Sequence, residues 1–473
     1  MSIPGLGIAP TAATPTAAPT STATTTIVSL QPFWEWRFEV PVSSSLTIRL
    51  LSGTAEKDGT ELAPSTPYTF SGAKSKINTW KGCELQVTAP TPDAYDAYTS
   101  KPTADETPMV SYLNLHMKLE GLRAAAAKAI GNGEGDMGPR ILVAGPANTG
   151  KTSLVKMLAG WATRMGHQPM VVNTDAAQGM LSLPGTLSAA VFATIMDITT
   201  EWGGIPSSGP VATPIKLPLA YYYGLSSPDE NLRLFKSLLS RLAVAATSRL
   251  AEDPDVKKTG MLIDTRTPNA AKGGYDLLAH IVAEFSVNII IVLGSERMTA
   301  ELVRRFSGQR TSLGECIHVV GLDKSGGVVE RDAAFMQGAR EATIREYFFG
   351  DVRRSLSPFT QSVAFDGVGI WRIMEAPTTA TADSDDFYNV SSREQLLEKV
   401  EPSLMMVNCM LAVMYASVHD APETIRDSNI MGFVYVADVD EKKKRLKVLA
   451  PVSAKLGDRP LLWGSYPEPM VSL

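Results

Sequence analysis

The run from Gly145 to Thr152 constrains the fold of this chain more than any other feature. It reads Gly-Pro-Ala-Asn-Thr-Gly-Lys-Thr, follows an apolar stretch at 140–144 that is typical of a buried strand, and precedes a helical pattern at 153–160. A glycine-rich bend between a strand and a helix lets several backbone N–H groups converge on a phosphate at the start of the helix. The run therefore predicts a phosphate-binding loop within an α/β domain.

Each position of this loop has an expected role in holding a nucleotide. The Lys151 ammonium would reach the terminal phosphates, and the Thr152 hydroxyl would coordinate Mg²⁺. The other predicted nucleotide-contacting positions are Gly145, Asn148, Thr149, Gly150 and Ser153. Guanine recognition normally uses an Asn-Lys-x-Asp run, and the sequence contains none, so ATP is the expected nucleotide. A tight turn that binds nothing is the alternative interpretation.

Two aspartates at the ends of apolar, strand-like stretches are candidate magnesium ligands. Asp175 follows the stretch 170–173, and Asp264 ends the stretch 260–264. A carboxylate at such a place can orient Mg²⁺ or its water, and Asp175 could accept a proton from an attacking hydroxyl. Gln178 could position metal-bound water or a substrate. Either aspartate could instead cap a helix or a turn.

Three arginines, Arg331, Arg340 and Arg345, lie within or beside a helical pattern that follows the run 324–331. Arginines at such spacing can form a lid that closes on a transferring phosphate and neutralises developing charge. The alternative is a solvated basic helix face that pairs with Glu341 and Glu346.

The pattern along the chain predicts a tail followed by three domains. Residues 1–27 consist mainly of Thr, Ala, Pro, Ser and Gly, which predicts a disordered tail. Residues 28–114 show short alternating runs broken by glycine turns, as in a β-sandwich or barrel. Residues 115–350 begin with an alanine-rich helical stretch at 115–130. Strand-like and helical stretches then alternate, which indicates a parallel sheet with crossover helices.

Residues 351–473 predict a third, mixed and largely β domain. Helical character at 393–400 and an apolar run precede a hairpin-like pair of strands near 432–436 and 446–449, and the polar stretch 378–386 is expected to be a loop. The predicted fold class is a multidomain α/β protein, in which a P-loop NTPase-like parallel sheet is flanked by an N-terminal β-sandwich and a mainly β C-terminal domain.

The composition of the 473 residues excludes several classes of protein. No apolar stretch reaches the roughly 18 to 20 residues that a bilayer span needs, so no membrane association is expected. The formal net charge of −5 argues against a generally basic nucleic-acid-binding surface. Cys83, Cys316 and Cys409 are widely separated, and we expect reduced core thiols and neither disulfides nor a zinc site.

Ordered motifs along nearly the whole chain after the tail resemble one protein family. They are Glu35-Trp-Arg-Phe-Glu-Val40, Gly53-Thr-Ala-Glu56, Gly59-Thr-Glu-Leu62, Gly72-Ala-Lys74, the phosphate loop, Asp175-Ala-Ala-Gln-Gly179, Ser182-Leu-Pro-Gly-Thr186, Lys324-Ser-Gly-Gly-Val-Val-Glu-Arg331, Ile344-Arg-Glu-Tyr347 and Gly432-Phe-Val-Tyr-Val-Ala-Asp-Val-Asp440. The family is that of the eukaryotic polyribonucleotide 5′-hydroxyl-kinases, which includes the ATP-binding subunit of the pre-mRNA cleavage and polyadenylation machinery. The resemblance implies that the N-terminal β domain folds over ATP, and that Glu35 and Lys74 approach the base and its surroundings.

Two departures from the active members of this family bear on the expected function. Active members similar to this chain carry a tryptophan just after the strand that ends at Asp264, where a base could stack, whereas this chain has Pro268 and Asn269. Met336 and Gln337 stand where active relatives look more basic, which thins the expected lid. We therefore expect an ATP-binding scaffold subunit of the fungal type, in which ATP is held without efficient turnover.

The alternative is an active ATP-dependent kinase that phosphorylates the 5′-hydroxyl of RNA, with Asp175 as the base and one or more of the three arginines as the lid. A P-loop motor or switch is a third class, and neither a sensor arginine supplied in trans nor a switch loop is evident for it. For the scaffold, the resemblance implies a nuclear protein. Its partners would be other cleavage-factor subunits, notably the one that contacts the RNA polymerase tail, and contact with pre-mRNA would be indirect.

Overall fold

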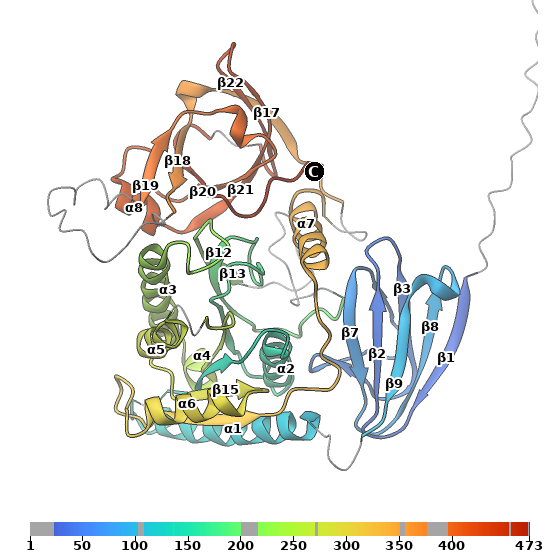
Figure 1. The fold of residues 1–473 in the computed structure, drawn as a ribbon. Coiled ribbons are helices and arrows are strands. Elements are labelled where there is room, and N and C mark those ends of the chain that lie inside the picture. Colours follow the sequence, from blue (N-terminus) through green and yellow to red (C-terminus); the bar gives the residue numbers. More distant parts are fainter. Residues whose placement is uncertain are drawn as a thin grey trace, which may run out of the picture.

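Three bodies follow one another along the chain in the computed structural model: a β domain, a central α/β domain and a second β-rich domain (Figure 1). The structure describes residues 23–102, 108–135, 137–199, 216–269, 273–350, 355–375, 396–453, 456–471 and 473. The predicted fold class is confirmed by the order of the strands in these bodies. Within the described ranges we find no helix whose length and apolar character would let it span a bilayer.

The N-terminal domain is a β-sandwich. One sheet has the order β1 (Thr24–Leu30), β8 (Cys83–Ala89), β3 (Leu46–Gly53) and β6 (Pro67–Phe70); the other has β5 (Thr60–Glu61), β4 (Glu56–Lys57), β7 (Ala73–Asn78), β2 (Glu35–Val40) and β9 (Asp96–Ser100), which follows the 3₁₀ turn Pro92–Ala94. Trp36, Phe38 and Ile48 are buried in the core between these sheets. The period of two seen in the sequence therefore turns one face of each strand inward.

The central domain is built on a seven-stranded sheet. Its order is β13 (Lys216–Tyr222), β12 (Thr186–Val191), β11 (Met170–Asn173), β14 (Met261–Asp264), β10 (Arg140–Ala144), β15 (Ile289–Leu293) and β16 (His318–Leu322). Neighbours from β11 to β16 are parallel, whereas β12 and β13 run antiparallel at one edge. The carboxyl ends of β10, β11 and β14 therefore lie together, and the phosphate loop, Asp175 and Asp264 follow them.

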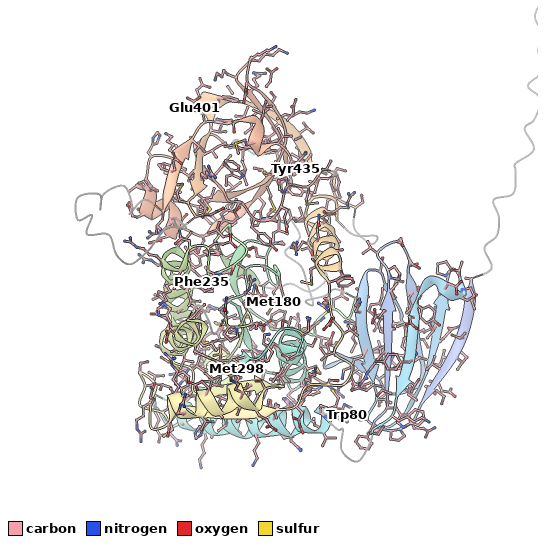
Figure 2. The ribbon with its side chains drawn as sticks, viewed as in Figure 1. Trp80, Met180, Phe235, Met298, Glu401 and Tyr435 are labelled. Atoms are coloured by element: carbon pink, nitrogen blue, oxygen red, sulfur yellow. The ribbon has the colours of Figure 1, made fainter. Side chains whose placement is uncertain are left out.

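Helices cover both faces of this sheet. They are α1 (Pro108–Gly131), α2 (Lys151–Arg164), α3 (Leu232–Glu252), α4 (Pro254–Thr259), α5 (Gly274–Glu284) and α6 (Glu296–Phe306), whereas α7 (Ala333–Phe349) stands apart, between the two outer domains (Figure 1). Side chains of α3, α5 and α6 share a core with Leu142 and Ala144, and those of α1 and α2 share another with Ile141 and Val143. Because alternate residues of β10 point to opposite faces, the two cores lie on opposite sides of the sheet. Figure 2 labels Phe235 of α3 and Met298 of α6.

The C-terminal domain is a second seven-stranded sheet, and its described residues also form the short helix α8 (Pro422–Asp427). Its order is β17 (Phe359–Ala364), β22 (Arg445–Ala450), β21 (Ile430–Asp440), β20 (Met410–Met414), β23 (Pro460–Trp463), β18 (Gly369–Ile373) and β19 (Leu397–Val400), with 3₁₀ turns at Phe365–Gly367 and Leu404–Met406. The predicted hairpin is confirmed, because β21 and β22 pair antiparallel. Tyr435, labelled in Figure 2, comes from this hairpin and donates a hydrogen bond to Met470 O at 2.6 Å.

The β4–β5 hairpin of the N-terminal domain docks on α2, the helix that starts at the phosphate loop. Residues 154–162 of α2 are all buried, so this helix is enclosed on every side. Asp58, in the turn of the hairpin, lies 3.3 Å from Lys156 Nζ, and Glu56 accepts hydrogen bonds from the indoles of Trp161 at 3.2 Å and Trp80 at 3.0 Å. Figure 2 shows Trp80 at this junction between the two domains.

Three local predictions differ from the structure. Residues 397–400, predicted to be helical, form the strand β19, because pairing with β18 overrides the local helical pattern. Cys316 is exposed, so the prediction of a core thiol is wrong for it, whereas Cys83 and Cys409 are free and buried as expected. The helix predicted from residue 115 begins at Pro108.

Other predictions concern segments that the structure describes in part or not at all. Strand β1 begins at Thr24, inside the stretch 1–27 that composition assigns to a tail, and residues 1–22 lie outside the described residues. The predicted loop at 378–386 also lies outside them, as do residues 393–395 of the predicted helix.

Candidate functional site

The phosphate loop has the backbone conformation that its glycines suggested. Gly150 has φ +83° and Asn148 has φ +53°, both in the left-handed region, and helix α2 begins at the next residue, Lys151. The residue before the helix is Gly150, which has no side chain that could cap it. The first N–H groups of α2 have no partner within the helix, so they and the helix dipole are directed at the loop, as an anion site requires.

Lys151 lies across the loop that precedes it. Its Nζ donates hydrogen bonds to Pro146 O at 2.8 Å, Gly145 O at 3.2 Å and the Thr267 hydroxyl at 3.1 Å. Burial lowers the pKa of this lysine, although the charges of Asp264 and Asp175 act in the opposite direction. Thr149 is buried and donates from its hydroxyl to Pro146 O at 3.0 Å, whereas Ser153 is exposed.

Thr152 and Asp264 meet as a magnesium site would require. The Thr152 hydroxyl donates to Asp264 Oδ2 at 2.5 Å, and among the described residues Asp264 Oδ1 is buried without a hydrogen-bond partner. Burial, increased by the nearby charge of Asp175, raises the pKa of Asp264 to about 7. A bound divalent cation would satisfy the orphaned oxygen and favour the ionised carboxylate. Mg²⁺ usually takes one or two protein carboxylates and completes its shell with phosphate and water oxygens, so this donor set fits it.

Asp175 and Gln178 form one turn after β11. Asp175 Oδ1 accepts from the Ala177 N–H at 3.1 Å and Oδ2 accepts from the Gln178 side-chain amide at 3.1 Å. The aspartate therefore caps its own turn, which was the alternative that the sequence left open. It also faces the site, because its charge and that of Lys151 shift each other's pKa. Burial raises the pKa of Asp175 in spite of the nearby cations Arg266 and Lys151.

A pocket of about 490 Å³ opens beside these residues. Its lining includes Lys151, Asp175, Gln178 and the loop 265–269 that follows β14. This volume falls within the range of roughly 300 to 1,000 Å³ that is usual for small-molecule sites. The pocket therefore provides room for a reacting group next to the phosphate loop and the candidate base.

The run 324–331 covers the phosphate loop from the other side. A Cβ placed on Gly150 would lie 3.4 Å from the Val328 side chain, and one placed on Gly327 would collide with the Arg37 guanidinium of β2. Arg37 in turn donates to Glu35 Oε2 at 2.9 Å. The loop between β16 and α7 is therefore held between the N-terminal domain and the phosphate loop.

Glu35 lies at the edge of a second cavity, between the domains. The lining includes Glu35, Arg37 and Trp80 from the N-terminal domain together with Ser325 and Gly326 from the covering loop. Burial opposes ionisation of Glu35, but Lys76 at 2.6 Å and Arg37 more than offset it, and the pKa of Glu35 is lowered. A carboxylate held ionised beside an interdomain cavity can accept hydrogen bonds from the amino edge of a base.

The lysine beside Glu35 is Lys76, and Lys74 lies further along the strand. Lys74 is paired in register with Glu39 and forms an ion pair with it at 2.9 Å. Its Nζ also lies 5.3 Å from the centre of the Phe335 ring of α7, and Arg331 stacks on the same ring at 5.8 Å. Lys74 and Arg331 therefore meet at the start of α7, where the N-terminal domain touches the predicted lid.

The other two predicted lid arginines have different surroundings. Arg340 forms an ion pair with Glu468 at 2.7 Å and lies over the Tyr466 ring at 5.5 Å. Arg345 is exposed. The predicted partner Glu341 accepts instead from Gln337 at 3.0 Å. Arg340 is thus tied to the segment after β23, a contact that no local sequence pattern predicted.

Several residues around the site were missed at the level of sequence. Thr267 binds Lys151, Lys76 and Arg37 hold Glu35, and Tyr466 reaches the Asp175 turn. Glu56 belongs to the motif Gly53-Thr-Ala-Glu56, which the sequence singles out but whose role it does not reveal. Gly59 packs closely against α2, which has Gly160 at the contact. A glycine on each side is the one signal in the sequence that could have suggested this close approach.

The fold and this site define a three-domain P-loop nucleotide-binding protein. Its segments match three family descriptions: "N-terminal beta-sandwich domain of polyadenylation factor" over residues 29–126, "mRNA cleavage and polyadenylation factor CLP1 P-loop" over 145–350, and "Pre-mRNA cleavage complex II protein Clp1" over 356–468. The chain belongs to the Clp1 family of mRNA cleavage and polyadenylation factors.

Relatives match along the full length of the chain. The mRNA cleavage and polyadenylation factor clp1 of Botryotinia fuckeliana is 54% identical and that of Pyricularia oryzae is 46% identical, each over 100% of both chains. A solved structure of a wild-type Clp1p–Pcf11p complex is similar, with a TM-score of 0.80 and 26% identity over 94% of this chain and 98% of that one. A second, with the same coverage, TM-score and identity, is described by its Pcf11p–Clp1p interface and by ATP loss in a point mutant.

Proposed function

We propose that this chain is an ATP-binding scaffold subunit of the nuclear pre-mRNA 3′-end cleavage and polyadenylation machinery, and that it holds ATP and Mg²⁺ without efficient turnover. The observation that carries the proposal is the convergence of two domains on one nucleotide site. Glu35 and Arg37 of the N-terminal domain line one interdomain cavity together with residues 325–326, and Val328 of the same covering loop lies against Gly150 of the phosphate loop. A ligand that contacts both domains stabilises their closed arrangement.

Different residues would bind the phosphates, the cation and the base of the nucleotide. Lys151 and the N–H groups at the start of α2 would neutralise the phosphates, and Thr152 with Asp264 would hold the cation. Glu35 would accept from the base, as the family resemblance implies. When bound, ATP with Mg²⁺ would supply phosphates that the central domain holds and a base that the N-terminal domain holds. By mass action, a ligand at about a hundred times its Kd adds about 2.7 kcal/mol to the stability of the form that binds it.

The weak turnover that we propose is supported by two differences from active relatives, one in the pocket where an RNA acceptor would bind and one in the lid. Pro268 and Asn269 line the pocket where active relatives have a tryptophan, and loss of a stacking platform costs roughly 1 to 3 kcal/mol per base. Met336 and Gln337 replace lid cations, which weakens the stabilisation of charge that develops during transfer. Both changes affect transfer more than they affect ATP binding.

The proposed partners are other cleavage-factor subunits. Similar chains have been solved in complex with Pcf11p, and this chain covers 98% of one of them. We infer that the partner is the corresponding subunit, which contacts the RNA polymerase tail, and that pre-mRNA is contacted through the assembly. The chain's formal charge of −5 agrees with an indirect contact.

The pocket of about 490 Å³ beside Asp175 supports a second candidate function, that of a polynucleotide 5′-hydroxyl kinase. In such a reaction the RNA 5′-oxygen would form a bond to the γ-phosphorus, its proton would pass to Asp175, and the bond to the bridging oxygen would break to leave ADP. The raised pKa of Asp175 would suit a residue that takes up this proton.

One experiment separates the two functions. Purified protein is denatured and its nucleotide is identified, and a second sample is incubated with γ-labelled ATP, Mg²⁺ and a 5′-hydroxyl oligoribonucleotide. We expect intact triphosphate and no label on the RNA above that of Lys151→Ala. Multiple turnovers of transfer that depend on Lys151 would refute the scaffold and establish the kinase.

The scaffold also predicts coupled losses in Lys151→Ala. The melting temperature of this variant should be lower than that of the wild type and insensitive to added ATP, and its capture of the partner subunit should fall in parallel. Lys118→Ala, at an exposed position of α1, is the matched control and should behave like the wild type. Equal melting of Lys151→Ala and wild type, both unaffected by ATP, would contradict the proposed role of ATP.

A further inference from the structure

Helix α7 is in contact with all three domains. At its start, Phe335 lies under Lys74 of the N-terminal domain at 5.3 Å. Near its end, the Tyr347 hydroxyl accepts a hydrogen bond from the Phe433 N–H of the C-terminal domain at 3.0 Å. Figure 1 shows the helix standing between the two outer domains above the central one. Its position therefore depends on contacts that lie far apart in the sequence.

Between these two ends, α7 is attached to residues 464–468, which we call the strap. The strap leaves β23 and runs along the central domain, where the Tyr466 N–H donates to Gly224 O at 3.0 Å and the backbones of Gly464 and Gly224 are in contact. The Tyr466 hydroxyl donates to Ala177 O at 2.6 Å, inside the turn that Asp175 caps. Tyr466 is 6% exposed, so the strap is packed into the central domain and is not a loose end.

The strap holds Arg340 by two kinds of contact. Glu468 accepts from the Arg340 Nη2 at 2.7 Å, and the Tyr466 ring lies 5.5 Å from the guanidinium carbon. The side chain of Arg340 is only 13% exposed, and among the described residues its Nε has no hydrogen-bond partner. A stacked and ion-paired guanidinium is well fixed, and the remaining Nε donor of this one is buried.

We propose that the strap is a clamp on the lid: Tyr466 anchors it beside Asp175, and Glu468 neutralises Arg340, so that α7 stays in place and the arginine is not available to a transferring phosphate. This proposal rests on the proposed function, and it gives a structural cause for the weak turnover of ATP. An arginine already paired with a carboxylate provides less stabilisation to charge that develops elsewhere, because part of its field is cancelled. A lid that is attached to the C-terminal domain also opens less often, which favours retention of nucleotide.

Both halves of the clamp are needed for this effect. Glu468 is 49% exposed, and an exposed ion pair contributes little when it stands alone. Tyr466 supplies the rigidity, because its ring stacks on Arg340 and its hydroxyl is bound to the Asp175 turn. The clamp therefore couples the lid to the turn that carries the candidate base.

The test uses the full chain and two single variants. Glu468→Gln removes the charge and keeps the shape, and Tyr466→Phe removes the bond to Ala177 O and keeps the ring. A fluorescent ATP analogue is bound in the presence of Mg²⁺ and then chased with excess ATP to measure its dissociation rate. We expect release to be about fivefold faster in each variant, at the lower end of typical couplings between sites. Glu423→Gln, at an exposed position of α8, is the matched control and should release the analogue at the wild-type rate.

A double variant identifies the partner of Glu468. If the carboxylate acts through Arg340, Glu468→Gln should produce no further acceleration in an Arg340→Gln background. Release rates of both single variants equal to those of the wild type and of Glu423→Gln would overturn the clamp, as would full additivity in the double variant. Transfer of label to RNA by the wild-type chain would instead overturn the scaffold function. The clamp would still be tested separately, by the release rates of the variants relative to the wild type.

Discussion

Gly160→Ala should destabilise the junction between the N-terminal and central domains, although helix propensity alone predicts the opposite. Gly160 lies inside α2, where replacement of glycine by alanine in a helix contributes about 0.8 to 1.0 kcal/mol of stability. A Cβ at this position would lie 2.9 Å from Asp58 O and 3.1 Å from Gly59 C, both of them backbone atoms of the docked hairpin. The hairpin must therefore move away from the helix to admit one methyl group.

The cost of this movement exceeds the gain from propensity. Overpacking a well-packed site typically costs about 1 to 3 kcal/mol, and displacement of the hairpin also stretches the Asp58–Lys156 and Glu56–Trp161 contacts across the same junction. Because these contacts are strained as well, the cost should lie in the upper half of this range, at about 2 to 3 kcal/mol, which leaves a net loss of about 1 to 2 kcal/mol after the gain in propensity is subtracted. For a cooperative unit of about 150 to 250 residues, 1 kcal/mol corresponds to roughly 2 to 4 °C in melting temperature.

Gly121→Ala provides a control of opposite sign. Gly121 is exposed within α1, and a Cβ at this position would meet nothing within 4 Å among the described residues. Thermal melting followed by tryptophan fluorescence, which reports on Trp161 and Trp80 at the junction, should show a lower transition for Gly160→Ala and an equal or higher one for Gly121→Ala. An increase of the same size in both variants would show that the hairpin does not press on α2 and would refute the reasoning.

Three further predictions concern individual side chains. Burial lowers the pKa of His116 to about 4, whereas an unfolded chain takes up this proton near pH 6.5, so the free energy of unfolding should fall as the pH drops between these values, by at most about 3 kcal/mol. Urea titrations at several pH values should show that His116→Gln loses this part of the acid sensitivity. Glu56→Gln should lower the free energy of unfolding by about 2 kcal/mol, because hydrogen bonds to charged groups contribute roughly 1.5 to 3 kcal/mol, and the tryptophan emission should shift as two indole N–H groups lose an ionised acceptor. A thiol reagent should modify Cys316 in the native protein and spare Cys83 and Cys409 until the chain is denatured, because burial raises the pKa of both protected thiols; equal labelling rates for all of them would contradict their placement.

The parts of the fold that could be predicted are those with a strong local signal. The strands Arg140–Ala144, Met170–Asn173 and Met261–Asp264 appear in the sequence as short apolar runs, and the phosphate loop follows the first of them. Parallel pairing then brings Asp264 to the Thr152 hydroxyl without any further information. The core of the site is predictable because topology alone determines which strand ends meet.

The parts that could not be predicted depend on contacts between residues that lie far apart in the sequence. Nothing local indicates that Tyr466 reaches Ala177, or that Arg340 pairs with Glu468 and not with a carboxylate on its own helix. The strand β19 was mistaken for a helix for the same reason, since its partner β18 lies elsewhere in the sequence. Such contacts join residues far apart in the chain, and single-sequence patterns carry no record of them.

The enclosed helix α2 has a consequence for any attempt to divide this protein into pieces. A fragment that lacks the first hundred residues would present Trp161 and the neighbouring apolar surface to water and lose the contact between Lys156 and Asp58. Exposed apolar area of this kind drives self-association, so the isolated central domain should aggregate and be poorly soluble. The first two domains are therefore better produced and unfolded as a single cooperative body than as separate modules.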